Sequence, residues 1–151
     1  MKVVVDTNIA FSGILNSNSK IGELLIKSKN YFIFFSVDQL KKEIHKHKGK
    51  VKDITGYSEN EFMEANEIAV SKVKFIRDEL IPKSDLLTAE KLLQGIDPDD
   101  TVFLALSIHL HARLWTGDLK LIDGLAKKGY HKTITTKELY KIYLEKEMAK
   151  K

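Results

Sequence analysis

The sequence is organised around residues 2–8, which read Lys2-Val3-Val4-Val5-Asp6-Thr7-Asn8. Three consecutive β-branched apolar residues between polar ones predict a short strand that is buried on both faces. Asp6 follows this strand directly. In open α/β sheets, ligands bind beyond the carboxyl ends of the strands, so a carboxylate at this position is placed for chemistry. The alternative is an N-cap, in which the Asp6 side chain accepts a hydrogen bond at the start of the next helix.

Length and composition are those of one globular domain, which we expect to span residues 1–151. The chain has 43% hydrophobic and 30% charged residues, a composition that excludes a disordered protein. No apolar run approaches the length of a membrane span, and Asp6 interrupts the N-terminal valine run. We therefore expect no membrane association, no secretory signal and a cytoplasmic location. The absence of cysteine excludes disulfides and thiolate metal ligands.

Apolar segments of strand length alternate with segments of helical periodicity along the chain. After the first strand, we expect strands at residues 31–35, 113–116 and 132–134, where β-branched and aromatic side chains cluster. Residues 73–76 fit either a strand or the end of a helix. Strands that alternate with helices predict a mostly parallel sheet covered by helices on both faces.

The segment between the second and third expected strands contains two helical patterns. Ser36 is expected to cap a helix over residues 37–48. Two glycines predict a loop over residues 49–58. Ser58, with Glu61 three residues later, forms a capping-box pattern that predicts the start of a long helix.

A basic stretch lies between residues 41 and 52. It contains Lys41, Lys42, Lys46, Lys48, Lys50 and Lys52, together with His45 and His47. Glu43 is the only acid inside this stretch. Such a run suits a phosphate backbone, and the alternative is a solvated helix face. The net charge of +4 is too small to indicate a nucleic-acid partner by itself.

Four acids occupy related positions in the predicted sheet. Asp6 and Asp118 each follow a strand, Asp100 opens the most apolar helix, and Glu43 lies within the helix after the second strand. If the strands are parallel, these acids lie near one edge of the sheet, where their negative charges repel. Mg²⁺ or Mn²⁺ relieves such repulsion because hard cations prefer oxygen ligands. These ions can also activate a water and stabilise the charged oxygens of a phosphodiester.

Three blocks of sequence together resemble the PIN domain family. They are the strand that ends in Asp6-Thr7-Asn8, the block Asp97-Pro98-Asp99-Asp100 with Phe103-Leu104-Ala105-Leu106, and Trp115-Thr116-Gly117-Asp118. The blocks occur in the family's order and spacing, and the resemblance covers nearly the whole chain. It implies a three-layer α/β/α sandwich with a central, mostly parallel sheet of about five strands. It also implies a ribonuclease that hydrolyses RNA through a carboxylate-bound Mg²⁺ or Mn²⁺ ion and an activated water.

The resemblance also assigns roles to residues and suggests partners. The acids expected to hold one or two metal ions and to be catalytic are Asp6, Glu43, Asp100 and Asp118. Asn8 and Thr116 are expected to support this site by hydrogen bonding. The lysines expected to meet the RNA backbone are Lys41, Lys42, Lys46 and Lys48. Many PIN domains are the toxins (VapC-type) of toxin–antitoxin pairs, so the expected partners are RNA, an antitoxin protein and a second copy of this chain in a homodimer.

The neighbouring acids and the histidines have simpler expected roles. Asp97 and Asp99 fit turn and cap formation beside Asp100. The histidines, which are His45, His47, His109, His111 and His131, show no metal-ligand pattern. Many family members carry another acid two or three residues after the position of Asp118, where this chain has Lys120 and Leu121. The fourth corner of the expected metal site is therefore weaker here.

Two functions other than a ribonuclease are compatible with parts of the sequence. A PIN-type module that binds RNA or protein without catalysis is the main alternative, and the complete set of four acids argues against it. A phosphohydrolase of the haloacid dehalogenase type also has an Asp after its first strand. That family needs a second Asp where this chain has Asn8, so we discount it. Toxin and RNA-processing roles both stay open at this point.

Overall fold

A five-stranded sheet forms the centre of the computed structural model, which describes residues 1–150. Its strands are β1 (Lys2–Val5), β2 (Ile33–Val37), β3 (Val73–Ile76), β4 (Arg113–Trp115) and β5 (Thr133–Ile134). All four pairings are parallel, and the order across the sheet is β3-β2-β1-β4-β5. The predicted parallel sheet of about five strands is confirmed, and residues 73–76 form a strand.

Nine α-helices and two short 3-10 helices connect these strands within residues 1–150. The α-helices are α1 (Thr7–Leu15), α2 (Lys20–Lys27), α3 (Asp38–Lys46), α4 (Lys48–Thr55), α5 (Glu59–Ala69), α6 (Lys83–Leu92), α7 (Thr101–Leu110), α8 (Leu119–Lys127) and α9 (Thr136–Ala149). The 3-10 helices are η1 (Asp78–Leu80) and η2 (Pro98–Asp100). In this part of the chain, no helix combines the length and apolar character needed to cross a membrane.

Strand β1 lies in the middle of the sheet because its side chains suit burial on both faces. Val3, Val4 and Val5 are each 0% exposed. Val4 pairs in register with Phe35 on one side and with Leu114 on the other. A β-branched run of this kind matches the strands of parallel sheets, which helices cover from both sides.

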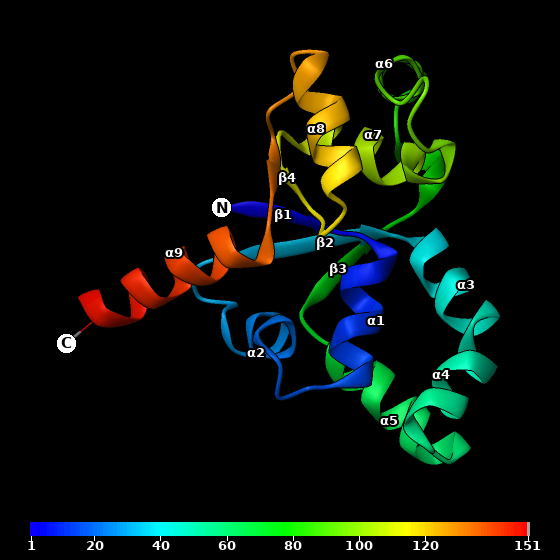
Figure 1. Ribbon diagram of the computed structural model, residues 1–151, viewed down its shortest axis with the longest axis vertical. Coiled ribbons are helices and arrows are strands. Elements are labelled where there is room, and N and C mark those ends of the chain that lie inside the picture. The colour runs from blue at the N-terminus through cyan, green and yellow to red at the C-terminus, as the bar shows by residue number, and fades with distance from the viewer. Residues whose placement is uncertain (151) are drawn as a thin grey trace.

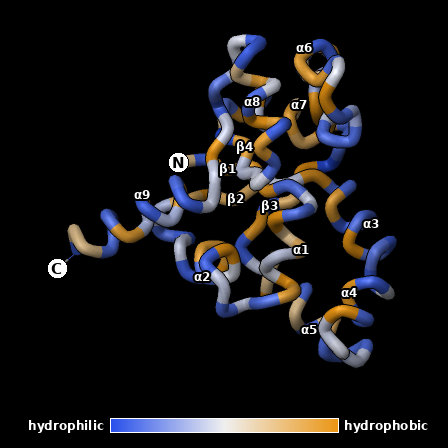
Figure 2. Tube along the Cα trace, viewed as in Figure 1, coloured by the Kyte–Doolittle hydropathy of each residue, from blue (hydrophilic) through white to orange (hydrophobic). Residues whose placement is uncertain are grey.

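Helices cover both faces of the sheet, which gives the predicted three-layer arrangement (Figure 1). Helix α7 packs against β1, β2 and β4, and α6 packs on α7. Helices α1, α2 and α5 pack against one another on the opposite face, and α9 contacts α2. Figure 2 shows hydrophobic residues along the central strands and α7, where the buried core lies.

The order of the strands creates one point at which the chain reverses direction across the sheet. From β1 the chain moves through β2 to β3, then returns to place β4 on the other side of β1. The carboxyl ends of β1 and β4 therefore lie side by side, with connections that leave toward opposite faces. Such a switch point leaves a crevice, which is the usual ligand site in this class of sheet.

Two predictions for the segment after β2 were wrong. Residues 49–55 of the expected loop belong to helix α4 (Lys48–Thr55), which begins directly after the C-cap of α3 at His47. Ser36 does not cap α3, because its buried hydroxyl donates a hydrogen bond to the Val5 carbonyl oxygen at 2.7 Å. Gly49 is tolerated near the helix start, and Gly56 ends α4 in the left-handed conformation (φ 76°).

A glycine in α2 permits a close approach that a larger residue would prevent. A Cβ atom at Gly22 would lie 2.6 Å from the carbonyl carbon of Ser17, so the backbone would have to shift. We expect Gly22→Ala to lower the free energy of unfolding by roughly 2 kcal/mol in urea denaturation. Gly49→Ala is the control, since a Cβ there meets nothing within 4 Å. Equal stability of the two variants would contradict this account of α2 packing.

Candidate active site

The acids at the ends of β1 and β4 meet at the switch point of the sheet. Val5, the last residue of β1, pairs in register with Trp115, the last residue of β4. Asp6 follows the first strand directly, and Asp118 lies three residues after Trp115. The parallel register thus brings two carboxylates that are far apart in the sequence to the same crevice.

Asp6 serves as a helix cap as well as a buried acid. Its carboxylate oxygen Oδ1 accepts a hydrogen bond from the Ile9 backbone N–H at 2.9 Å, which caps α1. The residue is only 5% exposed. Desolvation by burial is the main cause that raises the pKa of Asp6 from 3.8 to about 6, and the negative charge of Asp118 adds to it. The cap and the site therefore coexist, and neither explanation excludes the other.

Thr116 connects Asp6 to Asp118. The buried Thr116 hydroxyl lies beside the Asp6 carboxylate, and its interaction with this group partly offsets the rise in the pKa of Asp6. The same hydroxyl oxygen accepts a hydrogen bond from the Asp118 backbone N–H at 3.1 Å. A supporting role for Thr116 at a metal site stays a prediction. The other expected supporting residue, Asn8, is exposed at the edge of the same crevice.

Asp100 lies in the same crevice as Asp6. It ends η2 and precedes α7, and its side chain makes no capping hydrogen bond. Partial burial is the largest cause that raises the pKa of Asp100 from 3.8 to about 7. The negative charges of Asp6, Asp97, Asp118 and Asp99 raise it further, in that order. The effect of the Asp6 charge on the pKa of Asp100 indicates that the two carboxylates are close enough to repel each other.

A cavity of about 210 Å³ gathers most of these acids, and we call it the acid cavity. Its acidic lining residues are Asp6, Glu43, Asp97, Asp99 and Asp100. Asp118 lines an adjoining cavity of about 610 Å³, which Asp97 also borders. The structure thus places three of the four expected acids in one cavity and the fourth beside it.

Glu43 reaches the acid cavity from helix α3. Its carboxylate lies 3.6 Å from Nε2 of His47, one helical turn later. His47 also lines the cavity, a placement that the sequence analysis missed. Its i,i+4 spacing from Glu43 is the signal that could have indicated it, because residues four apart share one helix face.

Asp97 and Asp99 have the expected turn and cap contacts and also line the acid cavity. Asp97 caps η2 by accepting a hydrogen bond from the Asp99 backbone N–H at 2.9 Å. Two lysines on α8, Lys120 and Lys127, line the adjoining cavity together with Asp118. No sequence pattern separated these two lysines from the many other exposed ones.

The four expected RNA-binding lysines differ in their surroundings. Lys42 and Lys46 are exposed and form no ion pair within residues 1–150. Lys41 is exposed too, 4.0 Å from Asp38, with its Nζ 4.4 Å from the centre of the Phe75 ring. An RNA-contacting role for these three lysines stays a prediction.

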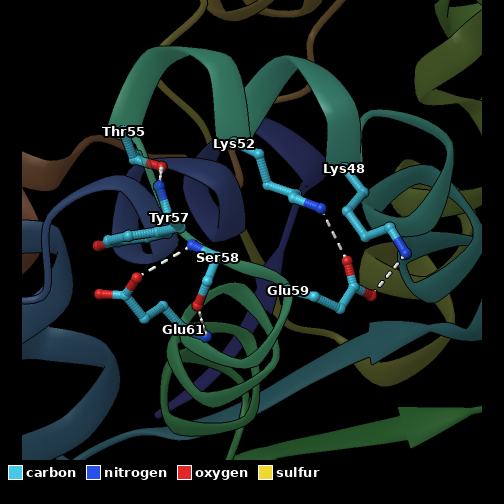
Figure 3. Close-up of polar contacts among 7 residues, drawn as sticks. All are labelled: Lys48, Lys52, Thr55, Tyr57, Ser58, Glu59 and Glu61. Atoms are coloured by element: carbon cyan, nitrogen blue, oxygen red, sulfur yellow. Dashed lines mark hydrogen bonds and ion pairs between the residues drawn. The ribbon is translucent and has the colours of Figure 1, made fainter.

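Lys48 is engaged within the protein (Figure 3). Its ammonium donates a hydrogen bond to one carboxylate oxygen of Glu59 at 2.8 Å, and Lys52 binds the other oxygen at 2.9 Å. These contacts join α4 to the start of α5, where the Ser58–Glu61 capping box is present as predicted. Lys48 would have to leave Glu59 to meet a phosphate, so it is the weakest of the four candidates.

Comparisons with known proteins identify the family. The sequence matches the family description "PIN domain" over residues 4–145, which is most of the chain. The chain belongs to the PIN domain family. The structure of this PIN domain is similar to a chain from the crystal structure of VapBC2 from Rickettsia felis bound to a DNA fragment from their promoter. That match has a TM-score of 0.67 and 16% sequence identity, and it covers 89% of this chain and 97% of that chain. A search of curated proteins gave no significant match.

The donor chemistry of this PIN domain suits a hard divalent cation. The charge of Asp118 raises the pKa of Asp6, and the charges of Asp6 and Asp118 raise the pKa of Asp100. No Lys or Arg among residues 1–150 forms an ion pair with these three acids. Carboxylate oxygens in this number are the ligands that Mg²⁺ and Mn²⁺ prefer. Among residues 1–150, no three His, Asp or Glu side chains lie close enough together to bind a metal ion in their present positions. The carboxylate oxygens are suitable ligands for such an ion, but the side chains would have to move closer together to bind it.

The raised pKa of Asp6 predicts a pH-dependent stability in the metal-free protein. The native state holds this proton up to about pH 6, whereas the unfolded chain releases it near pH 3.8. Native stability therefore falls as the pH rises between these two values. Asn caps helices about as well as Asp. In EDTA, we expect the free energy of unfolding of Asp6→Asn, relative to that of the wild type, to increase by about 2 kcal/mol from pH 4 to pH 8. Urea unfolding at each pH measures this difference. A constant difference across this range would show that Asp6 ionises normally.

Proposed function

We propose that this PIN domain is a ribonuclease that depends on Mg²⁺ or Mn²⁺ and hydrolyses RNA phosphodiester bonds. The observation that carries the proposal is that Asp6 and Asp100 both line the acid cavity, where the negative charge of Asp6 raises the pKa of Asp100. No cationic side chain of residues 1–150 pairs with either acid. A purely structural cluster would be stabilised by a lysine or arginine partner. Acids that lack one, at a sheet switch point, are suited to bind a cation and its phosphate ligand.

The residues of the chain divide the work of the site. Asp6, Asp100, Asp118 and Glu43 would hold the ion. When bound, a divalent cation supplies an activated water and stabilises the charged oxygens of the phosphodiester. Thr116 holds the carboxylate of Asp6 and the backbone of Asp118 in place, while the rigid cap on α1 prevents Asp6 from turning away. Glu43 lies on α3, the helix that also carries the exposed lysines.

The biological role that we favour is the toxin of a toxin–antitoxin pair in the cytoplasm. The structural likeness to the VapBC2 chain supports this role, since that protein was crystallised with DNA from its own promoter. An antitoxin protein and a second copy of this chain are the proposed partners. A second possible role with the same chemistry is RNA processing. The alternative without catalysis is a PIN module that binds RNA or protein, and the experiment below distinguishes it from a ribonuclease.

RNA cleavage by purified protein tests the proposal. We expect cleavage of a single-stranded RNA with Mg²⁺ or Mn²⁺ and none with EDTA. Asp6→Asn and Asp100→Asn should each lower the rate by at least about 100-fold, because each removes a negative ligand. Glu145→Gln, an exposed acid on α9 far from the site, is the matched control. Wild-type activity in Asp6→Asn would exclude catalysis at this site and favour the binding module.

The basic face of α3 generates a separate prediction about RNA affinity. We expect Lys42→Ala with Lys46→Ala to weaken RNA binding and to reduce the slope of log affinity against log salt by about 1.4, since each phosphate contact on a single strand contributes about 0.7. The measurement is fluorescence anisotropy in a salt series. Lys27→Ala with Lys29→Ala is the control, since these exposed lysines precede β2, at the opposite edge of the sheet. An unchanged slope would remove the α3 lysines from the RNA interface.

A further inference from the structure

A second, mostly apolar hollow opens between helices α1 and α4, and we call it the α1–α4 groove. Its volume is about 370 Å³. Phe11 and Leu15 form its wall on α1, and Val51 and Ile54 form its wall on α4. Ile54 is 64% exposed, so an apolar side chain is left open to solvent there. Lys50 stands at the same groove and supplies its positive charge.

The α1–α4 groove is continuous with the acid cavity. Asn8, Phe11 and His47 line both hollows. The rings of Phe11 and His47 meet edge to face, with 5.8 Å between their centres, at this boundary. A ligand whose charged part sits at the acids could therefore place a neighbouring flat, apolar part directly against Phe11.

We propose that the α1–α4 groove is a subsite for an unpaired nucleobase next to the phosphodiester that is cleaved in the acid cavity. The inference rests on the proposed ribonuclease function and adds the recognition of a base to it. Phe11, Val51 and Ile54 supply the apolar surface on which a base face packs. Asn8 offers an amide that can donate to and accept from a base edge, and Lys50 lies where the adjoining phosphate backbone would pass.

RNA fits these features better than an apolar peptide or a lipid does. The groove is short and opens at one end onto carboxylates that repel an acidic ligand unless a cation is present. A nucleotide combines a flat apolar base with a phosphate that a divalent cation can hold, so one ligand satisfies both hollows. Base stacking on protein side chains also tolerates different bases, because every base presents a π-face.

Helix α4 is held in the position that forms the groove. The ion pairs of Lys48 and Lys52 with Glu59 join it to α5. At its end, the Tyr57 backbone N–H donates a hydrogen bond to the Thr55 hydroxyl at 3.1 Å, and the Tyr57 hydroxyl donates to the Ile14 carbonyl oxygen of α1 at 3.3 Å. The lysines that anchor α4 thus build the groove, while Lys50 stays available at its edge.

Binding measurements in a cleavage-deficient background test this subsite. With Asp6→Asn protein and a fluorescein-labelled hexanucleotide RNA, we expect Ile54→Ser to raise the dissociation constant about fivefold, because apolar burial against the base is lost. Phe11→Leu should weaken binding about three- to tenfold through the loss of the aromatic ring. Leu144→Ser, at an exposed leucine on α9, is the matched control and should bind as the parent does. Thermal unfolding checks that each variant is folded.

An oligomer of the same length that lacks bases makes the test specific. Ile54→Ser and its parent should bind this ribose-phosphate chain equally well. Equal affinity of Ile54→Ser and Leu144→Ser for the ordinary RNA would overturn the subsite and leave the groove to another ligand, such as a protein segment. Absence of any RNA binding would overturn it too. A base-dependent effect of Ile54→Ser in a protein that cleaves no RNA would uphold the subsite while the ribonuclease proposal fails.

Discussion

The structure depends on a carboxylate that is forced into a buried position beside other carboxylates. The buried residues Val3, Val4 and Val5 place β1 in the middle of the sheet. Asp6 follows Val5 directly and therefore lies at the carboxyl end of this central strand. Burial and the neighbouring charges raise the pKa of Asp6 to about 6. The buried, ionised carboxylate of Asp6 therefore lowers the free energy of unfolding at neutral pH, and a bound cation would raise it again. The repulsion among these carboxylates destabilises the fold, and the same repulsion would favour the binding of a cation.

The elements around these carboxylates have separate tasks. The caps at Asp6 and Asp118 fix two acids to helix starts, where backbone N–H groups hold the carboxylates in one orientation. Asp100 makes no such side-chain contact, so it is freer to turn toward a ligand. Helices α3 and α4 add Glu43, a basic face and the α1–α4 groove on one side of the crevice.

Local sequence predicted four of the strands, the parallel sheet and the positions of Asp6 and Asp118 relative to it. Strand β2 lies two residues later than the expected 31–35, and the sequence left residues 73–76 open between a strand and a helix end. The prediction from local sequence succeeded for the four strands because side-chain pattern and burial agree over these short segments. It failed for Ser36, whose hydroxyl contacts the Val5 carbonyl oxygen across the sheet instead of capping α3. It also failed for residues 49–55, where two glycines suggested a loop. In α4, contacts with Glu59 of the next helix outweigh the weak local helix propensity.

The sequence by itself determined the buried first strand, the acid after it and the three blocks that resemble a PIN domain, because these are properties of neighbouring residues. Only the tertiary structure decided which acids share a cavity, that Lys48 is paired with Glu59, and that His47 and Phe11 join the acid cavity to an apolar groove. Each of these depends on distances between segments that are far apart in the chain. Strand order and helix packing set those distances, and no local pattern records them.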